Sequence, residues 1–510
     1  FMAGESEQAM RQLQKTLELA PEFSQARTIL AIGHLSKGEP EQALQIAEDA
    51  ISETPDSVDA YLLKLMVLQH NKDYSQAEKL LQTMKKKFPD ALAVHLARGS
   101  FFAERGQSET ARAAYQQVLK QDEKHVGALM RLAKLERDAG NSEAMGEWLA
   151  KANNVDPAAL MPALAYAEYL FKTGQPEPAT RVLGQVSEAE RDNQYYLSLL
   201  GQIQLSSGET QQAVTSYKRL TQVVPGSAPA RMALARARLV DNDKEGALAD
   251  LEVALKLDPD HLQAKVQKTQ LQFELGDKRG ANFSLNELLN AHPDSPAVWT
   301  LQGWMALRER DFVLAENAYE KVWNTLASPG VATEYARALM GLGKRDQAVE
   351  LLETTLSRHQ ENIDLLFALA TVYDAEKEGA KSIPLYEKVI KVRPTNYVAL
   401  NNLAWLLKET NPKRALALAT RAHEAVPKNP AVLDTYGLIL LEQGQSEKAE
   451  RILEQASSLS DFDPNMSFHY AQSLVKNGKA VQAKRVLQNA LAQSSTFPEA
   501  KEAEKLLNSL

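Results

Sequence analysis

Small residues recur at a fixed interval through almost the whole chain. Nine alanines fall on a period of 34 residues, and Met145 occupies the one intervening rung. After single-residue deletions the series continues with four alanines and one serine. These positions form the grid: Ala9, Ala43, Ala77, Ala111, Met145, Ala179, Ala213, Ala247, Ala281, Ala315, Ala348, Ser382, Ala415, Ala449 and Ala483. Such a period indicates a stack of similar units, because each unit buries its apolar face only against its neighbours.

Glycine and proline keep the phase of the grid. Glycines lie five residues before grid positions: Gly4, Gly38, Gly106, Gly140, Gly174, Gly208, Gly276, Gly343, Gly444 and Gly478. Prolines lie twelve residues after grid positions: Pro21, Pro55, Pro89, Pro157, Pro225, Pro259, Pro293, Pro394 and Pro427. Glycine suits the left-handed residue just past a helix end, and proline cannot continue a helix. Each unit is therefore predicted to contain a turn at the glycine and a break at the proline.

The segments between these markers have the periodicity of amphipathic helices. Ala213, Tyr217 and Leu220, for example, lie on one face of a helix. We expect two antiparallel helices in each unit. The grid alanine fits where the two helices approach most closely, since a larger side chain would hold them apart.

The repeated pattern resembles the tetratricopeptide repeat, in which small, aromatic and proline positions follow in this order with this period. An aromatic residue follows the grid alanine by four positions at Tyr115, Tyr217 and Tyr319, and Tyr436-Gly437 matches the first helix of that motif. The resemblance implies an all-α fold: a right-handed α-solenoid of about fourteen helix-turn-helix repeats.

The phase of the grid also predicts the organisation of the chain. Residues 1–498 are expected to form one continuous array, in which residues 1–21 are the second half of a truncated repeat. Because Phe1-Met2-Ala3-Gly4 would end a first helix, we expect more protein upstream. Residues 499–510 are expected to form a charged capping helix.

One part of the array departs from the pattern, near residues 376–415. Ser382 replaces the grid alanine, Gly379 looks like a displaced turn glycine, and Pro384 falls at the start of a helix. The next unit is one residue short and has Pro412 in its loop. Two irregular units in succession predict a change in curvature of the solenoid.

The sequence shows no sign of catalytic or metal chemistry. Phosphate-binding, dinucleotide-binding, hydrolase and zinc-protease motifs are absent, there is no cysteine, and the nine histidines are isolated from one another. A net charge of −8 argues against nucleic acid as the partner, and no apolar stretch is long enough to span a membrane. We therefore expect no enzyme activity, no cofactor, no metal and no membrane insertion by this segment. The predicted function is binding of a protein or peptide.

The first helix of each repeat lines the concave groove in this fold, so the residue eleven positions before the grid is expected to face the groove. We call this series the lane: Ile32, Met66, Ser100, Lys134, Glu168, Gln202, Arg236, Gln270, Trp304, Arg337, Thr371, Trp405 (shifted by one), Leu438 and Gln472. Aromatic and guanidinium groups dominate binding hot spots. Arg236, Trp304, Arg337 and Trp405 are therefore predicted to grip an extended peptide or a helix. In the alternative interpretation the tryptophans pack on neighbouring helices and the charges are only solvated.

Three runs in the C-terminal third narrow the resemblance: residues 401–407, 411–419 and 429–437. They are similar to the tetratricopeptide lipoproteins encoded with exosortase/PEP-CTERM sorting and exopolysaccharide production in Gram-negative bacteria. This resemblance implies a periplasmic scaffold, held at the outer membrane by a lipid anchor upstream of Phe1, that assists export of exopolysaccharide or of sorted proteins. The alternatives are a cytosolic adaptor of a multiprotein complex and the regulatory array of an enzyme outside this segment.

Overall fold

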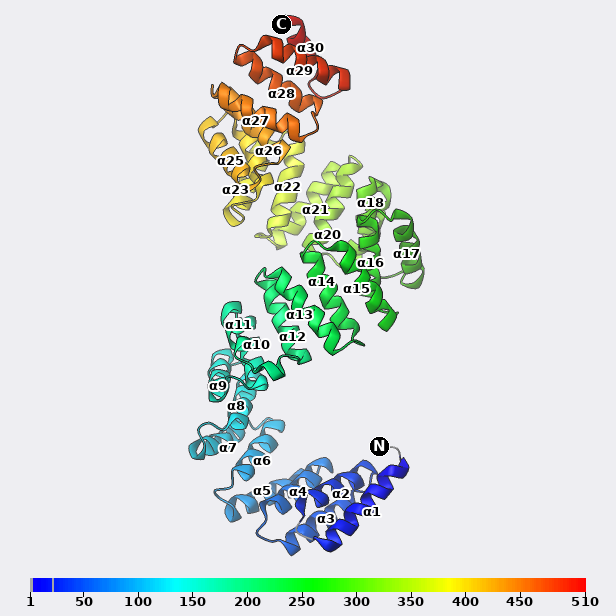
Figure 1. The fold of residues 1–510 in the computed structure, drawn as a ribbon, viewed down its shortest axis with the longest axis vertical. Helices are drawn as coiled ribbons and strands as arrows, with labels where there is room; N and C mark the ends of the chain where they lie inside the picture. The colour runs from blue at the N-terminus through cyan, green and yellow to red at the C-terminus, as the bar shows by residue number, and fades with distance from the viewer. Residues whose placement is uncertain (1–2, 21–22) are drawn as a thin grey trace. The chain divides into compact units, whose positions relative to one another are not determined.

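The computed structural model describes residues 3–20 and 23–510, and its regular elements are all helical (Figure 1). Over these residues there are thirty α-helices and one 3-10 helix, which confirms the predicted all-α class. Contacts divide the chain into two compact units, Phe1–Asp260 and His261–Leu510. Each is described by itself.

The first unit contains the leading helix and seven helical hairpins. Its helices are α1 (Ala3–Leu19), α2 (Ser24–Ser36), α3 (Pro40–Glu53), α4 (Val58–His70), α5 (Tyr74–Lys87), α6 (Leu92–Glu104), α7 (Ser108–Gln121), α8 (Val126–Asp138), α9 (Ser142–Val155), α10 (Leu160–Lys172), α11 (Pro176–Gly184), η1 (Glu188–Glu190), α12 (Gln194–Ser206), α13 (Thr210–Val223), α14 (Ala228–Val240) and α15 (Lys244–Leu257).

The second unit contains seven more hairpins and a final helix. Its helices are α16 (Leu262–Glu274), α17 (Lys278–Ala291), α18 (Pro296–Glu309), α19 (Phe312–Thr325), α20 (Pro329–Gly341), α21 (Arg345–Arg358), α22 (Ile363–Ala375), α23 (Gly379–Val392), α24 (Tyr397–Leu407), α25 (Pro412–Ala425), α26 (Pro430–Glu442), α27 (Ser446–Leu459), α28 (Pro464–Lys476), α29 (Ala480–Gln493) and α30 (Ala500–Ser509).

The hairpins α2/α3 to α28/α29 are the fourteen repeats that the grid predicts for the described residues. The last helix, α30, buries Ala503 in a cluster with Phe468 and Leu487 of the final hairpin. It thereby covers apolar surface that would otherwise face water. The organisation of residues 1–498 as one continuous array stays a prediction.

Grid residues lie at the centre of each hairpin. From Ala43 to Ala483, every grid alanine and Ser382 is completely buried, whereas Met145 and Ala9 are half-buried. Van der Waals packing leaves no room beside such a position, because protein interiors are as dense as organic crystals. The complete burial of the thirteen positions from Ala43 to Ala483 other than Met145 agrees with the prediction that small residues permit close helix approach.

A second close approach accompanies the grid. Gly99, Gly201 and Gly303 each lie twelve residues before a grid alanine and face a tyrosine four residues after it. A Cβ atom on Gly201 would come within 2.8 Å of the Tyr217 ring, and one on Gly99 within 2.2 Å of Tyr115. The aromatic ring therefore occupies the space that the missing side chain leaves, which locks the two helices of the hairpin together.

Thirteen of the fourteen described hairpins have a left-handed residue in their turn at the predicted phase. The nine glycines of the series from Gly38 to Gly478 all have φ between 71° and 92°. Lys72, Asn242, Arg310 and Lys377 adopt the same conformation on four of the five rungs that lack glycine. The exception is Thr410, in the short turn between α24 and α25. Backbone phase therefore decides this conformation even where a Cβ atom makes it costly.

Some sequence predictions about these markers are wrong. Gly379 is not a displaced turn glycine: Lys377 takes the left-handed position with φ of 58°, and Gly379 is the first residue of α23. Gly4 lies inside α1 and does not follow a helix end. Phe1, Met2 and Pro21 lie outside the described residues. The described prolines of the series, such as Pro55, follow the last helical residue by two positions, as predicted.

The irregular region around residues 376–415 differs in detail from its prediction. Pro384 lies inside α23, five residues after its first residue, and so it removes an interior backbone donor. Pro412 is not in a loop but is the first residue of α25, where its missing N–H costs nothing. The predicted change in curvature stays a prediction.

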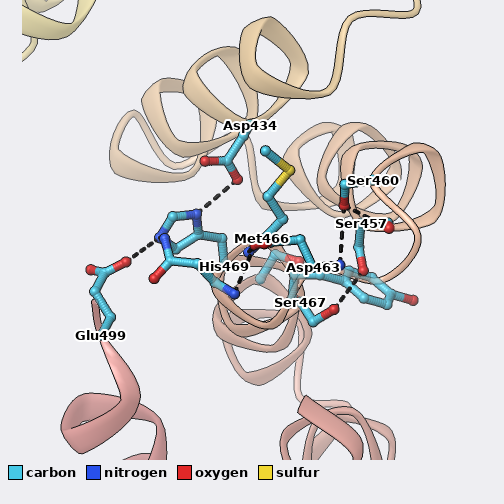
Figure 2. A network of polar contacts seen from close by, with 11 residues as sticks. Asp434, Ser457, Ser460, Asp463, Met466, Ser467, His469 and Glu499 are labelled. Atoms are coloured by element: carbon cyan, nitrogen blue, oxygen red, sulfur yellow. Dashed lines mark hydrogen bonds and ion pairs between the residues drawn. The ribbon is translucent and has the colours of Figure 1, made fainter. Parts of the chain in front are cut away.

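A buried histidine connects the C-terminal helices of the second unit (Figure 2). His469 of α28 lies with Nδ1 at 2.7 Å from Asp434 of α26 and Nε2 at 2.5 Å from Glu499, the residue before α30. Burial alone would lower the pKa of His469, but hydrogen bonds and charges from the two carboxylates outweigh it, and the pKa is raised. The imidazolium form is the one that can donate to both carboxylates at once.

Candidate functional site

The lane is a continuous feature of the first helices within each unit. None of its fourteen residues is buried, although the positions on either side include fully buried side chains such as Ala235 and Ala338. The phase of the grid therefore identifies a face of each first helix that its neighbours leave at least partly uncovered. Among the described residues no group of three or more His, Asp or Glu side chains could hold a metal ion.

The four predicted binding residues differ in how much they expose. Arg236 of α14, in the first unit, is exposed. In the second unit, Arg337 of α20 has 63% of its side chain exposed and Trp405 of α24 is 45% exposed, whereas Trp304 of α18 is half-buried. The ring of Trp405 lies 4.7 Å from the ammonium of Lys408.

Trp304 packs against its surroundings, as in the alternative interpretation. Its ring meets that of Phe273 edge to face at 5.6 Å, and the guanidinium of Arg308 stacks over it at 3.6 Å. It also contacts the apolar cluster around Leu285 and Met305. Much of its surface therefore stabilises the second unit, and removing the ring would weaken the fold as well as the lane.

Arg337 lies in a cavity of about 610 Å³ on α20 and α22. The α20–α22 cavity is lined by Gly330, Thr333, Glu334, Ala336, Arg337, Met340, Leu352, Asp364, Phe367, Ala368, Thr371, Val372 and Ala375. Its charges are paired: Arg337 bonds Glu334 at 3.0 Å, and Asp364 accepts from Arg393 at 2.8 Å. Beside it, burial raises the pKa of Tyr319, and the charge of Glu334 adds to this effect.

A second hollow in the lane was not identified from the sequence. Two adjoining cavities of about 330 and 480 Å³ follow α8, α10 and α12 in the first unit. The α8–α12 groove is lined by Met130, Ala133, Lys134, Arg137, Met145, Leu149, Met161, Leu164, Ala165, Glu168, Tyr169, Phe171, Lys172, Tyr195, Ser198, Leu199 and Gln202.

The two hollows use the same positions of the repeat. Besides the lane residue, both hollows are lined by the side chains that lie 15 and 18 positions before a grid residue. In the groove these are Leu164 and Met161, which precede Ala179, and in the cavity they are Phe367 and Asp364, which precede Ser382. These positions continue the lane along one helix face toward its N-terminus. Large apolar residues 18 positions before the grid were the signal that could have identified the groove.

Comparisons with known proteins agree on the repeat. Tetratricopeptide repeat families match residues 34–99 and 241–305, residues 306–496, and residues 96–159 and 198–261. Together these matches cover most of the chain.

Three curated relatives resemble it. The Arabidopsis thaliana protein CTR9 homolog is 24% identical over 84% of this chain and 44% of its own length. A TPR repeat-containing protein of Pseudomonas aeruginosa is 30% identical over 24% of this chain and 21% of its own. Cellulose synthase operon protein C of Pseudomonas fluorescens is 23% identical over 88% of this chain and 43% of its own length. The chain spans less than half the length of each of these relatives.

Two solved structures are similar. The crystal structure of the APC/C hetero-tetramer Cut9-Hcn1 matches with 16% identity and a TM-score of 0.46 over 98% of both chains. That of YrrB, a TPR protein described as having an unusual peptide-binding site, matches with 18% identity and a TM-score of 0.32, covering 36% of this chain and 95% of its own.

Proposed function

Since this chain belongs to the tetratricopeptide repeat family, we propose that it is a scaffold that holds a protein or peptide partner along the lane and has no catalysis of its own. The observation that carries the proposal is the lane: a row of side chains, repeated from first helix to first helix, that the fold leaves uncovered and in places hollowed. Pockets of this size accept side chains of a partner segment.

The proposed setting is export of exopolysaccharide or of sorted proteins in the periplasm of a Gram-negative bacterium, with a lipid anchor at the outer membrane upstream of this segment. Two observations support it. The similarity to cellulose synthase operon protein C extends over 88% of this chain. The runs 401–407, 411–419 and 429–437 resemble the exosortase-associated lipoproteins. No helix in the described part of the chain has the length and apolar character needed to cross a bilayer.

The scaffold function can be tested by photo-crosslinking in cells of the natural host. A benzophenone amino acid replaces Thr371 in the α20–α22 cavity of the full-length protein. The matched control replaces Thr325, which is exposed on the second helix α19. We expect a discrete crosslinked protein from position 371 and none from position 325. Crosslinks from position 325 alone would contradict binding along the lane.

The setting needs separate measurements. We expect the protein in the outer-membrane fraction, accessible to protease once the outer membrane is opened, and we expect deletion of its gene to lower secreted polysaccharide or sorted protein. Recovery in the cytosol would favour the adaptor alternative. Recovery as part of a longer enzyme would favour the regulatory array.

A further inference from the structure

We propose that the α8–α12 groove binds an acidic segment of a partner protein that carries at least one large apolar side chain. This inference rests on the proposed function, because it assigns the chemistry of a partner that occupies part of the lane. It depends on two observations: apolar groups that the fold leaves exposed, and an excess of cations around them.

The apolar part of the groove lies toward the N-terminal ends of its helices. Met161, near the start of α10, and Tyr195, near the start of α12, are each 66% exposed. Both lie 18 positions before a grid alanine, and Met130, Leu164 and other apolar side chains line the same cavity. Covering two such large side chains with an apolar group of a partner removes that surface from water. Methionine suits a varied partner because its unbranched side chain adapts its shape.

The charged part lies farther along the same helices. Lys134, Arg137 and Lys172 line the groove with a single carboxylate, Glu168, so its lining has three positive charges and one negative, a balance of +2. The whole chain has a net charge of −8. A basic site on an acidic protein attracts acidic partners and repels basic ones.

The arrangement of these cations indicates which one is available for a partner. Lys172 pairs with Glu168 at 2.5 Å, and Arg137 with its neighbour Asp138 at 3.0 Å. Both lie in the last turn of their helices, where a cation also complements the helix dipole. Lys134 is different: it is exposed, lies in the middle of α8, and forms no ion pair within the described residues. Neither the helix dipole nor an ion pair stabilises the charge of Lys134, and a carboxylate of the partner could pair with it.

The test measures binding of three fluorescein-labelled peptides to the full-length protein by fluorescence anisotropy. The first peptide contains Glu and Ala with Leu side chains at helical spacing. In the second, each Glu is Lys, and in the third, each Leu is Ser. We expect the first peptide to bind, and each of the other two to bind at least roughly tenfold more weakly. Binding of the first peptide should weaken as the salt concentration is raised.

Variants place the binding in the groove. Lys134→Glu and Met161→Ser should each weaken binding of the first peptide roughly tenfold, because they reverse the available charge or remove the exposed apolar group. Lys218→Glu makes the same charge change at an exposed position on the second helix α13 and should leave binding unchanged. Unaltered helical circular dichroism shows that each variant is folded.

Several results would overturn the proposal. Tighter binding of the Lys peptide would reverse the assigned partner chemistry but leave the scaffold function in place. Equal binding by Lys134→Glu would place the peptide elsewhere. A dimer of this chain that Met161→Ser dissociates would make a second copy the occupant. Failure of the scaffold function itself is recognised separately, by crosslinks that come only from the control position 325.

Discussion

The α8–α12 groove and the α20–α22 cavity are built from the same repeat positions and differ in chemistry. In the groove these positions supply Met161, Tyr195 and Lys134, whose ammonium has no ion pair with any described residue. In the cavity they supply Thr371 and Arg337, and the guanidinium is already bonded to a carboxylate of its own helix. The repeat therefore determines where a hollow forms, whereas the residues at three of its positions decide what the hollow can accept.

The largest expected effect comes from a substitution that destabilises the helices of the α8–α12 groove and leaves those of the α20–α22 cavity intact. Ala179→Leu inserts a large side chain at a fully buried grid position of α11, next to the groove helices. It should cost on the order of 1–3 kcal/mol, because overpacking forces strained rotamers and backbone shifts. Since each repeat contacts only its neighbours, hydrogen exchange should rise in α10–α12 and stay unchanged in α20–α22.

The matched control is Glu177→Leu, which adds the same side chain at an exposed position of α11. Its cost should be within about 0.5 kcal/mol. Loss of protection along the whole chain after Ala179→Leu would contradict the idea that the two sites are independent.

The next prediction converts one site toward the other. Thr371→Lys places an ammonium at the lane position of the α20–α22 cavity, the position that Lys134 occupies in the groove. It should create weak binding of the acidic Leu peptide, about tenfold tighter than in the parent cavity. The measurement is made in a Lys134→Glu background so that the groove does not contribute.

Thr325→Lys adds the same charge on the exposed face of α19 and serves as its control. If both lysines raise the affinity equally, the gain reflects net charge alone, and the repeat position has no special role.

A pH prediction asks whether the C-terminal end of the second unit responds differently from the first unit. The pKa of His469 is raised, so its contribution to stability is fully present below the ordinary value of 6.5 and is lost as pH rises through the raised value. The facing groups are Asp434, Glu499 and the amide of Asn465. Urea unfolding should show that the free energy of unfolding falls by on the order of 1 kcal/mol as the pH rises from below 6.5 to above the raised pKa.

His469→Gln cannot titrate and should remove this part of the pH dependence. A circular dichroism signal reports the whole chain, so hydrogen exchange in α28–α30 compared with α8–α12 locates the effect. An equal response of α8–α12 would show that another group is responsible.

The smallest expected effect concerns the turns. Lys377→Gly should stabilise the second unit by about 0.5 kcal/mol, because glycine relieves a left-handed backbone but loses more entropy on folding. Lys72→Gly should do the same for the first unit. Thermal unfolding of the two variants checks this, and a loss of stability in either would contradict the assigned strain.

Much of the fold follows from phase alone. The grid spacing predicts the fourteen hairpins, the buried alanines and the left-handed turns, because each depends on contacts inside one repeat. Gly379 shows where residue type misleads. A glycine there suggested the left-handed turn residue, but the grid spacing places that residue at Lys377, where the structure has it. Where residue type and phase disagree in this chain, the phase is the better guide.

The site was less predictable because it depends on contacts between repeats. The phase predicts that the lane is uncovered, yet Trp304 meets Phe273 of an earlier first helix, and no spacing within its own repeat reveals this. Met161 and Tyr195 look like core residues of an amphipathic helix in the sequence. They are exposed because neighbouring repeats do not cover them at that end.

The tyrosines whose rings pack against a glycine of the same hairpin can report, through their absorbance, on whether that hairpin is folded. Burial raises the pKa of Tyr115, Tyr217 and Tyr319, which recur every 102 residues, one in every third repeat. Each phenol is therefore expected to ionise more readily once its own hairpin opens. Phenolate absorbance, with the tyrosines replaced one at a time by phenylalanine, would therefore resolve the order in which distant hairpins open without any attached label.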